Sequence, residues 1–146
     1  MKKTIQLLAA ASLLNACAHT GNDPDAALKE QARQFSEAYF SYNFAKARQY
    51  VTPDSEKWLQ FAASNLTQAD IDLINATSQQ LTVTPTQCTH LNDSATHVNV
   101  VLYNAVLKDN LEQPAHTAET ADFTLTLIKR GDQYLVRMAG LPRPAK

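Results

Sequence analysis

Glycine and cysteine are scarce in this sequence, which has only three glycines and two cysteines among its 146 residues. The glycines are Gly21, Gly131 and Gly140, so there is no glycine-rich phosphate-binding loop, and no Gly-x-Ser-x-Gly nucleophile motif is present. The four histidines are dispersed, with no His-Glu-x-x-His motif and no paired cysteines. We therefore expect no metal site and no other cofactor.

The sequence also lacks an excess of charge of either sign, because 13 basic residues are balanced by 14 acidic ones and the net charge is −1. Such a mixed surface has no basic field to attract nucleic acid or anionic lipid, so nucleic acid is not an expected partner. A long hydrophobic run is missing as well. Residues 5–14 are apolar apart from Gln6 and Ser12, and a run of this length is too short for a bilayer, which needs about 20 apolar residues.

The N-terminus instead has the pattern of an export signal, in which Lys2 and Lys3 precede the short apolar run and small residues follow it. At the end of the run, Leu14-Asn15-Ala16-Cys17 resembles the lipobox of bacterial lipoproteins. The resemblance implies a signal peptide over residues 1–16, a lipid attached to Cys17 and a membrane partner reached through that lipid. The alternative is a plain secretory signal followed by an unrelated cysteine.

The residues after Cys17 bear on location. By the sorting rule of such lipoproteins, an Asp directly after the cysteine would imply retention, whereas Ala18 at this position implies the outer membrane. No acidic cluster follows that would imply export to the cell surface. We therefore expect the bacterial cell envelope, at the periplasmic face of the outer membrane. Residues 17–23 comprise the lipidated Cys17 and a short tether, residues 18–23, which extends at most about 20 Å and holds the domain close to the bilayer.

The rest of the chain has the length of one domain, which we place at residues 24–141, followed by a flexible tail over residues 142–146. Loss of Lys2 and Lys3 with the signal would lower the net charge to about −3. If Cys17 carries lipid, Cys88 is a single thiol without a disulfide partner. We expect Cys88 to be a small, half-buried apolar residue.

The first half of the domain has helical patterns. Asp23 and Pro24 suit a helix start, and apolar residues then recur in steps of three and four up to Tyr42. Asn43 interrupts this period and predicts a break in the helix. Thr52-Pro53-Asp54 and the capping-box pattern Thr67-Gln68-Ala69-Asp70 open further helices. We expect helices over residues 25–42, 44–51, 53–66 and 68–79.

The second half alternates apolar and polar residues as strands do, and we expect strands from residue 81, over 96–107, over 120–129 and over 133–139. Pro85 indicates an edge or a bulge, and Arg130-Gly131-Asp132 indicates a hairpin turn. In residues 96–107, the apolar face is expected to hold Val98, Val100, Leu102 and Val106. The opposite face would hold His97, Asn99, Val101, Tyr103 and Leu107. Helices followed by antiparallel strands make an α+β fold.

The order of elements, together with one stretch of the chain, suggests a family. That stretch is Ala45-Lys46-Ala47-Arg48-Gln49-Tyr50-Val51-Thr52-Pro53-Asp54-Ser55. Residues 25–140 resemble small bacterial lipoproteins of the nuclear transport factor 2-like superfamily, which has the cystatin-like α+β roll. The resemblance implies helices, one of them long, packed on a curved sheet of about four strands, with a cone between them that is open at one end. The side chains expected to line it, unless they only form core, are Phe35, Tyr39, Tyr42, Trp58, Tyr103 and Phe123.

The function expected from these features is that of a non-catalytic binding or accessory module, anchored to the membrane, for a small apolar ligand or an envelope protein. The alternative is a pocket enzyme that uses acid-base chemistry, for which the best candidates are His97, Asn99, Tyr103 and Asp122. We assign no catalytic residue, because the strand pattern places these polar side chains opposite the most apolar face. A purely structural lipoprotein is a third alternative, and no pattern indicates an oligomeric state.

Overall fold

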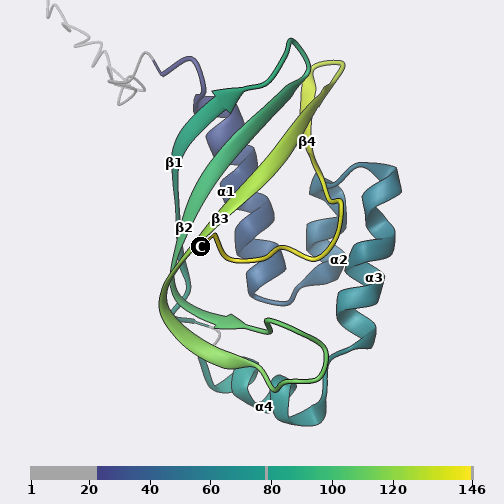
Figure 1. Ribbon diagram of the computed structural model, residues 1–146, viewed down its shortest axis with the longest axis vertical. Helices are drawn as coiled ribbons and strands as arrows, with labels where there is room; N and C mark the ends of the chain where they lie inside the picture. Colours follow the sequence, from purple (N-terminus) through teal and green to yellow (C-terminus); the bar gives the residue numbers. More distant parts are fainter. Residues whose placement is uncertain (1–22, 78, 146) are drawn as a thin grey trace, which may run out of the picture.

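A computed structural model describes residues 23–77 and 79–145, so the predicted signal peptide and Cys17 lie outside the described residues. In the described part the helices are α1 (Ala26–Phe40), α2 (Phe44–Ala47), α3 (Glu56–Ser64) and α4 (Gln68–Thr77). The strands are β1 (Thr82–His90), β2 (Ala95–Leu107), β3 (His116–Arg130) and β4 (Gln133–Arg137). They form one antiparallel, unclosed sheet in the order β1-β2-β3-β4 (Figure 1). The predicted α+β class, with helices packed on a curved four-stranded sheet, is confirmed.

The helix boundaries follow from local chemistry. The end of α1 is set by Tyr42, whose backbone takes the left-handed conformation with φ 62°, and the side chain of Asn43 then caps α2 by accepting from the Lys46 N–H at 3.1 Å. The capping box of α4 is confirmed in both directions. The Thr67 N–H donates to the Asp70 carboxylate at 2.9 Å, and the Asp70 N–H donates to the Thr67 hydroxyl at 3.2 Å.

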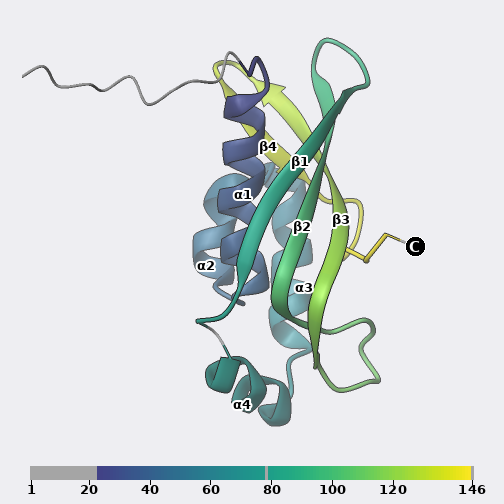
Figure 2. The ribbon, with the colours of Figure 1, turned by 90° about the vertical axis from the view of Figure 1, so that its left-hand side faces the viewer.

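The main core lies between α1 and the concave face of the sheet, as Figure 2 shows. Phe35 is fully buried on α1, opposite the inward-facing residues of β2 and β3. Those strand residues are Val98, Val100, Leu102, Phe123, Leu125 and Leu127. Burial of each such side chain stabilises the fold by about 1.5–3 kcal/mol, so this layer provides the principal driving force for folding.

The sheet bends sharply in the lower half of Figure 1. Within β2, Asn104 has φ 54°, a left-handed conformation that bends the strand at this position. Asn tolerates this left-handed conformation better than most residues do. The alternation of β2 changes phase there, so that Ala105 and Leu107 continue the inner face begun by Leu102. Our assignment of Val106 to the inner face and Leu107 to the outer face was therefore wrong. Val106 is buried but lies outside the main core cluster.

The two edge strands of the sheet, β1 and β4, differ in their backbone pairing. At the β1 edge the register with β2 shifts between Pro85 and Cys88, which confirms the predicted edge or bulge at Pro85. At the other edge, Val51 forms a parallel bridge with Val136 of β4, and the Thr52 N–H donates to the Val136 carbonyl at 2.9 Å. The end of the stretch at residues 45–55 thus ties the helical layer to β4.

The chain leaves the sheet after Arg137 and returns to it at Ala145. The Met138 N–H donates to the Ser55 hydroxyl at 2.8 Å, and the Ala145 N–H donates to the Asp122 carbonyl of β3 at 2.7 Å. We call residues 138–145 the strap. Residues 142–146 were expected to be a flexible tail. The described part of this segment, residues 142–145, ends against the sheet, because the Ala145 N–H bonds to β3. No helix in the described ranges has the length and apolarity to cross a membrane.

Candidate functional site

A small cavity lies at the end of α1 that is far from Asp23. It is bounded by the last turn of α1, by the end of α3, by the β2–β3 loop at residues 108–115 and by the strap. Its volume is about 40 Å³, which is room for about two or three water molecules. The lining side chains are mostly apolar: Tyr39, Phe40, Tyr42, Phe44, Ala62, Leu66, Leu107, Leu111, Phe123, Leu141, Pro142 and Pro144, with Asn65, Lys108 and Asp109 as the polar members.

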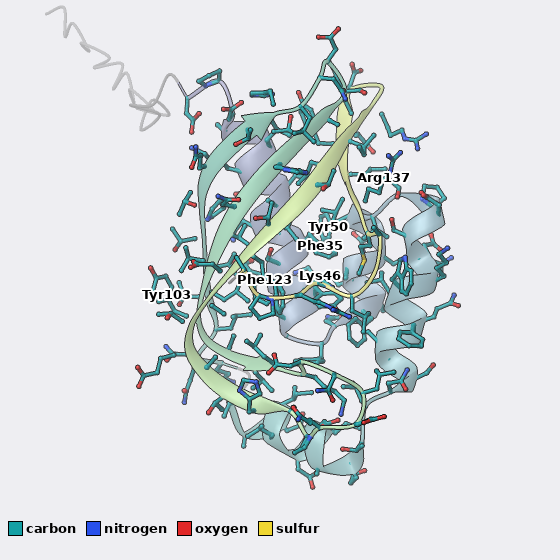
Figure 3. The ribbon with its side chains drawn as sticks, in the orientation of Figure 1. Phe35, Lys46, Tyr50, Tyr103, Phe123 and Arg137 are labelled. Carbon is teal, nitrogen blue, oxygen red and sulfur yellow. The ribbon has the colours of Figure 1, made fainter. Side chains whose placement is uncertain are left out.

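The structure brings three of the six predicted pocket residues to this cavity, namely Tyr39, Tyr42 and Phe123. The other three lie elsewhere. Phe35 is fully buried in the main core, and Trp58 on α3 is partly buried against that core. Tyr103 is 40% exposed and points away from the helices in Figure 3, because Leu102 takes the inward position at that point of β2.

Aromatic rings make one continuous wall of the cavity. The ring centroids of Phe40 and Phe123 are 4.7 Å apart, those of Tyr39 and Phe40 5.0 Å, and those of Tyr39 and Phe44 5.4 Å. Tyr42 continues the row, with its centroid 5.9 Å from that of Phe44. Each such pair adds about 0.5–1.5 kcal/mol beyond simple burial, so these contacts stabilise the wall.

Tyr42 connects this wall to the bent half of the sheet. Its hydroxyl donates to the Val106 carbonyl at 2.8 Å. Burial raises the pKa of Tyr42 well above its ordinary value, and the negative charges of Asp70 and Asp109 add to the effect. The phenol is therefore neutral at physiological pH and acts as a hydrogen-bond donor rather than as a base.

Beside the cavity, Lys108 forms a buried ion pair with Asp70 of α4, with 2.6 Å between Nζ and the carboxylate oxygen. The Asp70 side chain is fully buried, and it also accepts from the backbone N–H groups of Thr67 at 2.9 Å and Ala115 at 2.8 Å. Burial alone would raise the pKa of Asp70, but Lys108 and these N–H groups hold it well below its ordinary value. The ammonium of Lys108 also donates to the Gln113 carbonyl at 3.1 Å. Both ends of the loop that lines the cavity are thus tied to α4.

A second ion pair lies on the surface of the same loop. His116 Nε2 is 2.6 Å from the carboxylate of Asp109, and both side chains are about half exposed. The hydrogen bond to Asp109 raises the pKa of His116 above its ordinary value. Within the loop, the Asn110 side chain accepts from the backbone N–H groups of Glu112 and Gln113. The loop has its own local structure as well as its ties to α4.

The sequence pattern identified Asp70 as a capping residue but did not indicate its pairing with Lys108. The two residues are 38 positions apart, so no local pattern joins them. The capping box itself was the available signal. An Asp at that position already accepts a backbone N–H and keeps further acceptor capacity for a partner.

The candidate acid-base residues do not form a cluster. In the register of β2 and β3, His97 lies opposite Thr126, four positions along β3 from Asp122, which is a separation of about 13 Å. Asn99 accepts from the Thr124 hydroxyl at 2.9 Å, and Asp122 is exposed. The inner positions of these strands are taken by Val98, Val100 and Phe123, so the polar residues lie on the outer face.

Comparisons with known proteins add no family. A scan against protein-family models matches none of them, and a search of the curated proteins finds no match either. The likeness to the nuclear transport factor 2-like lipoproteins therefore stays a prediction. Among the residues that the structure describes, no three His, Cys, Asp or Glu side chains gather as a metal site would require.

Proposed function

We propose that this chain is a membrane-anchored, non-catalytic binding module of the bacterial cell envelope, held by a lipid on Cys17 at the periplasmic face of the outer membrane. The single observation that carries the binding role is the aromatic-walled cavity at the end of α1 remote from Asp23. The lipobox pattern of residues 14–17 supports the anchor.

The position of the cavity suits a partner in the periplasm better than a membrane lipid. The start of the described chain lies at the end of the molecule that also holds the β1–β2 and β3–β4 turns (Figure 1), where the carboxylate of Asp25 is 2.8 Å from Nε2 of His90 at the end of β1. The cavity is lined by the opposite end of α1, a helix of 15 residues that spans about 22 Å. With the tether attached at Asp23, the cavity faces away from the bilayer.

The size of the cavity favours a protein partner over a free small ligand. Sites for drug-sized ligands occupy about 300–1,000 Å³, whereas this cavity measures about 40 Å³. A partner that contacts its mouth needs no such volume. Leu111 lines the mouth and is 42% exposed, which leaves an apolar side chain available for contact.

The charged groups of the cavity support binding rather than catalysis. Lys108 is paired with Asp70, and Asp109 is paired with His116. A general acid or base must reach a substrate proton with a free lone pair or hydrogen, and in this site those groups are engaged in holding the loop. The polar residues considered for catalysis lie on the outer face of the sheet.

The proposal is tested by site-specific photo-crosslinking in living cells. A photoreactive phenylalanine analogue replaces Leu111 at the mouth or, as the matched control, Tyr103 on the outer face, which is similarly exposed. We expect one discrete protein adduct from position 111 in the membrane fraction and none at the same mass from position 103. Identical adduct patterns from both positions, or no adduct from position 111, would contradict the proposal.

A further inference from the structure

The path of the strap differs from the path that continued pairing of β4 with β3 would give. Arg137 of β4 lies opposite Thr126 of β3, so continued pairing would bring residue 141 opposite Asp122. Instead the backbone of Ala145 bonds to Asp122. Four extra residues are therefore looped out of the sheet between these two points.

The looped residues place a proline-containing segment against the aromatic wall. Leu141, Pro142 and Pro144 line the cavity together with Tyr39, Phe40, Phe44 and Phe123. Proline-rich extended segments are stiff, and aromatic-lined grooves bind such segments in other proteins. The strap thus has the composition of a peptide ligand for the surface on which it lies.

The strap is attached mainly at its two ends. Within the described residues, its backbone N–H groups make hydrogen bonds at Met138, to Ser55, and at Ala145, to Asp122. Arg143 and Pro144 between these points are exposed. A second cavity of about 230 Å³ is lined by residues 138–143 of the strap together with Phe35, Leu125 and Val136. Movement of the middle of the strap would break its side-chain contacts with the cavity wall but neither of these backbone hydrogen bonds.

We propose that the strap occupies a peptide-binding groove as an intramolecular ligand, and that the protein partner inserts an extended segment of the form apolar-Pro-x-Pro in its place. This inference rests on the proposed function and names the partner's chemistry. The segment needs no charge of its own, because Lys108 and Asp109 at the rim are already paired with Asp70 and His116. Specificity comes from the prolines and the apolar residue that meet the aromatic wall.

The strap competes with any incoming segment at a high effective concentration, since both ends are tethered to the same domain. If the groove is free for only about one molecule in ten to one in a hundred, the apparent affinity for a peptide in trans falls by the same factor. Loosening the strap should raise the apparent affinity for the peptide by that factor of about 10–100.

The test measures binding of one labelled peptide to three forms of the full chain purified from cells. The peptide is a synthetic copy of residues 141–146 with a fluorophore at its N-terminus, and the readout is the dissociation constant from fluorescence anisotropy. The strap-loosened form carries Pro142→Gly and Pro144→Gly. The matched control carries Arg143→Gly, which adds glycine flexibility at an exposed position that does not line the aromatic cavity.

We expect the strap-loosened form to bind the peptide at least tenfold more tightly than the unaltered chain, and the Arg143→Gly form to bind like the unaltered chain. A peptide with glycines in place of both prolines should bind neither. Equal binding to the loosened and control forms, both with unchanged circular dichroism, would overturn the inference. Leu141→Ser replaces the double variant if that variant fails to fold, with the same expected result.

The same experiment separates this inference from the proposed function. If the peptide does not bind the loosened form while position 111 still gives its discrete adduct in cells, the module binds a partner by other means and only the strap inference is wrong. If the adduct is also missing, the proposed function is wrong as well.

Discussion

The buried ion pair between Lys108 and Asp70 leads to a sharp prediction for Lys108→Met. Methionine matches the length of the lysine side chain but removes the ammonium, so the carboxylate of Asp70 stays buried with only the N–H groups of Thr67 and Ala115 as donors. The Lys108 and Asp70 side chains are 10% and 0% exposed, so water cannot replace the missing charge without a rearrangement of the loop.

Removal of one partner from a buried ion pair costs about 3–5 kcal/mol, because the other charge is left unpaired. The free energy of unfolding of a domain of this size is about 5–15 kcal/mol, so the loss is a large fraction of it. At roughly 4 °C per kcal/mol, the midpoint of thermal unfolding should fall by about 12–20 °C. Asp109→Asn alters the neighbouring residue, whose ion pair is half exposed, and should cost less than about 1 kcal/mol.

The assay is urea unfolding followed by circular dichroism at several pH values. The pKa of Asp70 is lowered on folding, so its contribution to stability is present above its unfolded value of 3.8 and is lost as the pH falls toward the folded value. The difference between the unaltered chain and Lys108→Met should therefore be largest near neutral pH and shrink below pH 3.8. A loss below 1 kcal/mol at pH 7, or a difference that does not change with pH, would refute this reasoning.

Four further predictions concern single positions. The pKa of His116 is raised on folding, so its bond to Asp109 stabilises the fold below pH 6.5, and this stabilisation is lost as the pH rises through the folded value. The free energy of unfolding in urea should therefore be lower for His116→Gln than for the unaltered chain at pH 5.5, and equal at pH 9. Cys17→Ser should leave the domain folded and release it from washed membranes, and retention there would refute the lipobox prediction. Cys88→Ser should cost about 1 kcal/mol in thermal unfolding without loss of crosslinking from position 111, and a loss would indicate a role for the thiol. Asn104 has φ 54°, so Asn104→Val should destabilise the chain by about 1–2 kcal/mol and Asn104→Gly should not; equal losses would show that the bend does not depend on this conformation.

Sequence patterns predicted the order of helices and strands because the periods of 3.6 and 2 are local properties of the chain. Gly131, with φ 61°, occupies the predicted hairpin turn, and Pro85 lies on an edge strand as expected. The bend at Asn104 was missed because Tyr-Asn-Ala within an apolar strand has no turn signal. Leu107 was assigned to the wrong face for that reason, since one residue in the left-handed conformation shifts the alternation of all that follow.

The candidate site was predicted only in part because it depends on long-range contacts. The aromatic residues of α1 and Phe123 could be placed near each other, since a helix that covers a sheet must bury its apolar stripe. The pairing of Lys108 with Asp70, and the return of Ala145 to Asp122, join positions with no common local pattern.

The central claim is that the domain is anchored at one end and binds its partner at the other, and two exposed leucines allow a direct test. Leu91 lies in the β1–β2 turn, at the end of the domain that we propose to be anchored, and is 51% exposed, whereas Leu111 at the cavity mouth is 42% exposed. Each is replaced by a cysteine that carries a fluorophore, in a Cys88→Ser chain that carries the lipid we propose on Cys17 and is bound to vesicles that contain spin-labelled phospholipid. We expect strong quenching of the fluorophore at position 91 and little quenching at position 111. Equal quenching at both positions, or stronger quenching at position 111, would contradict it.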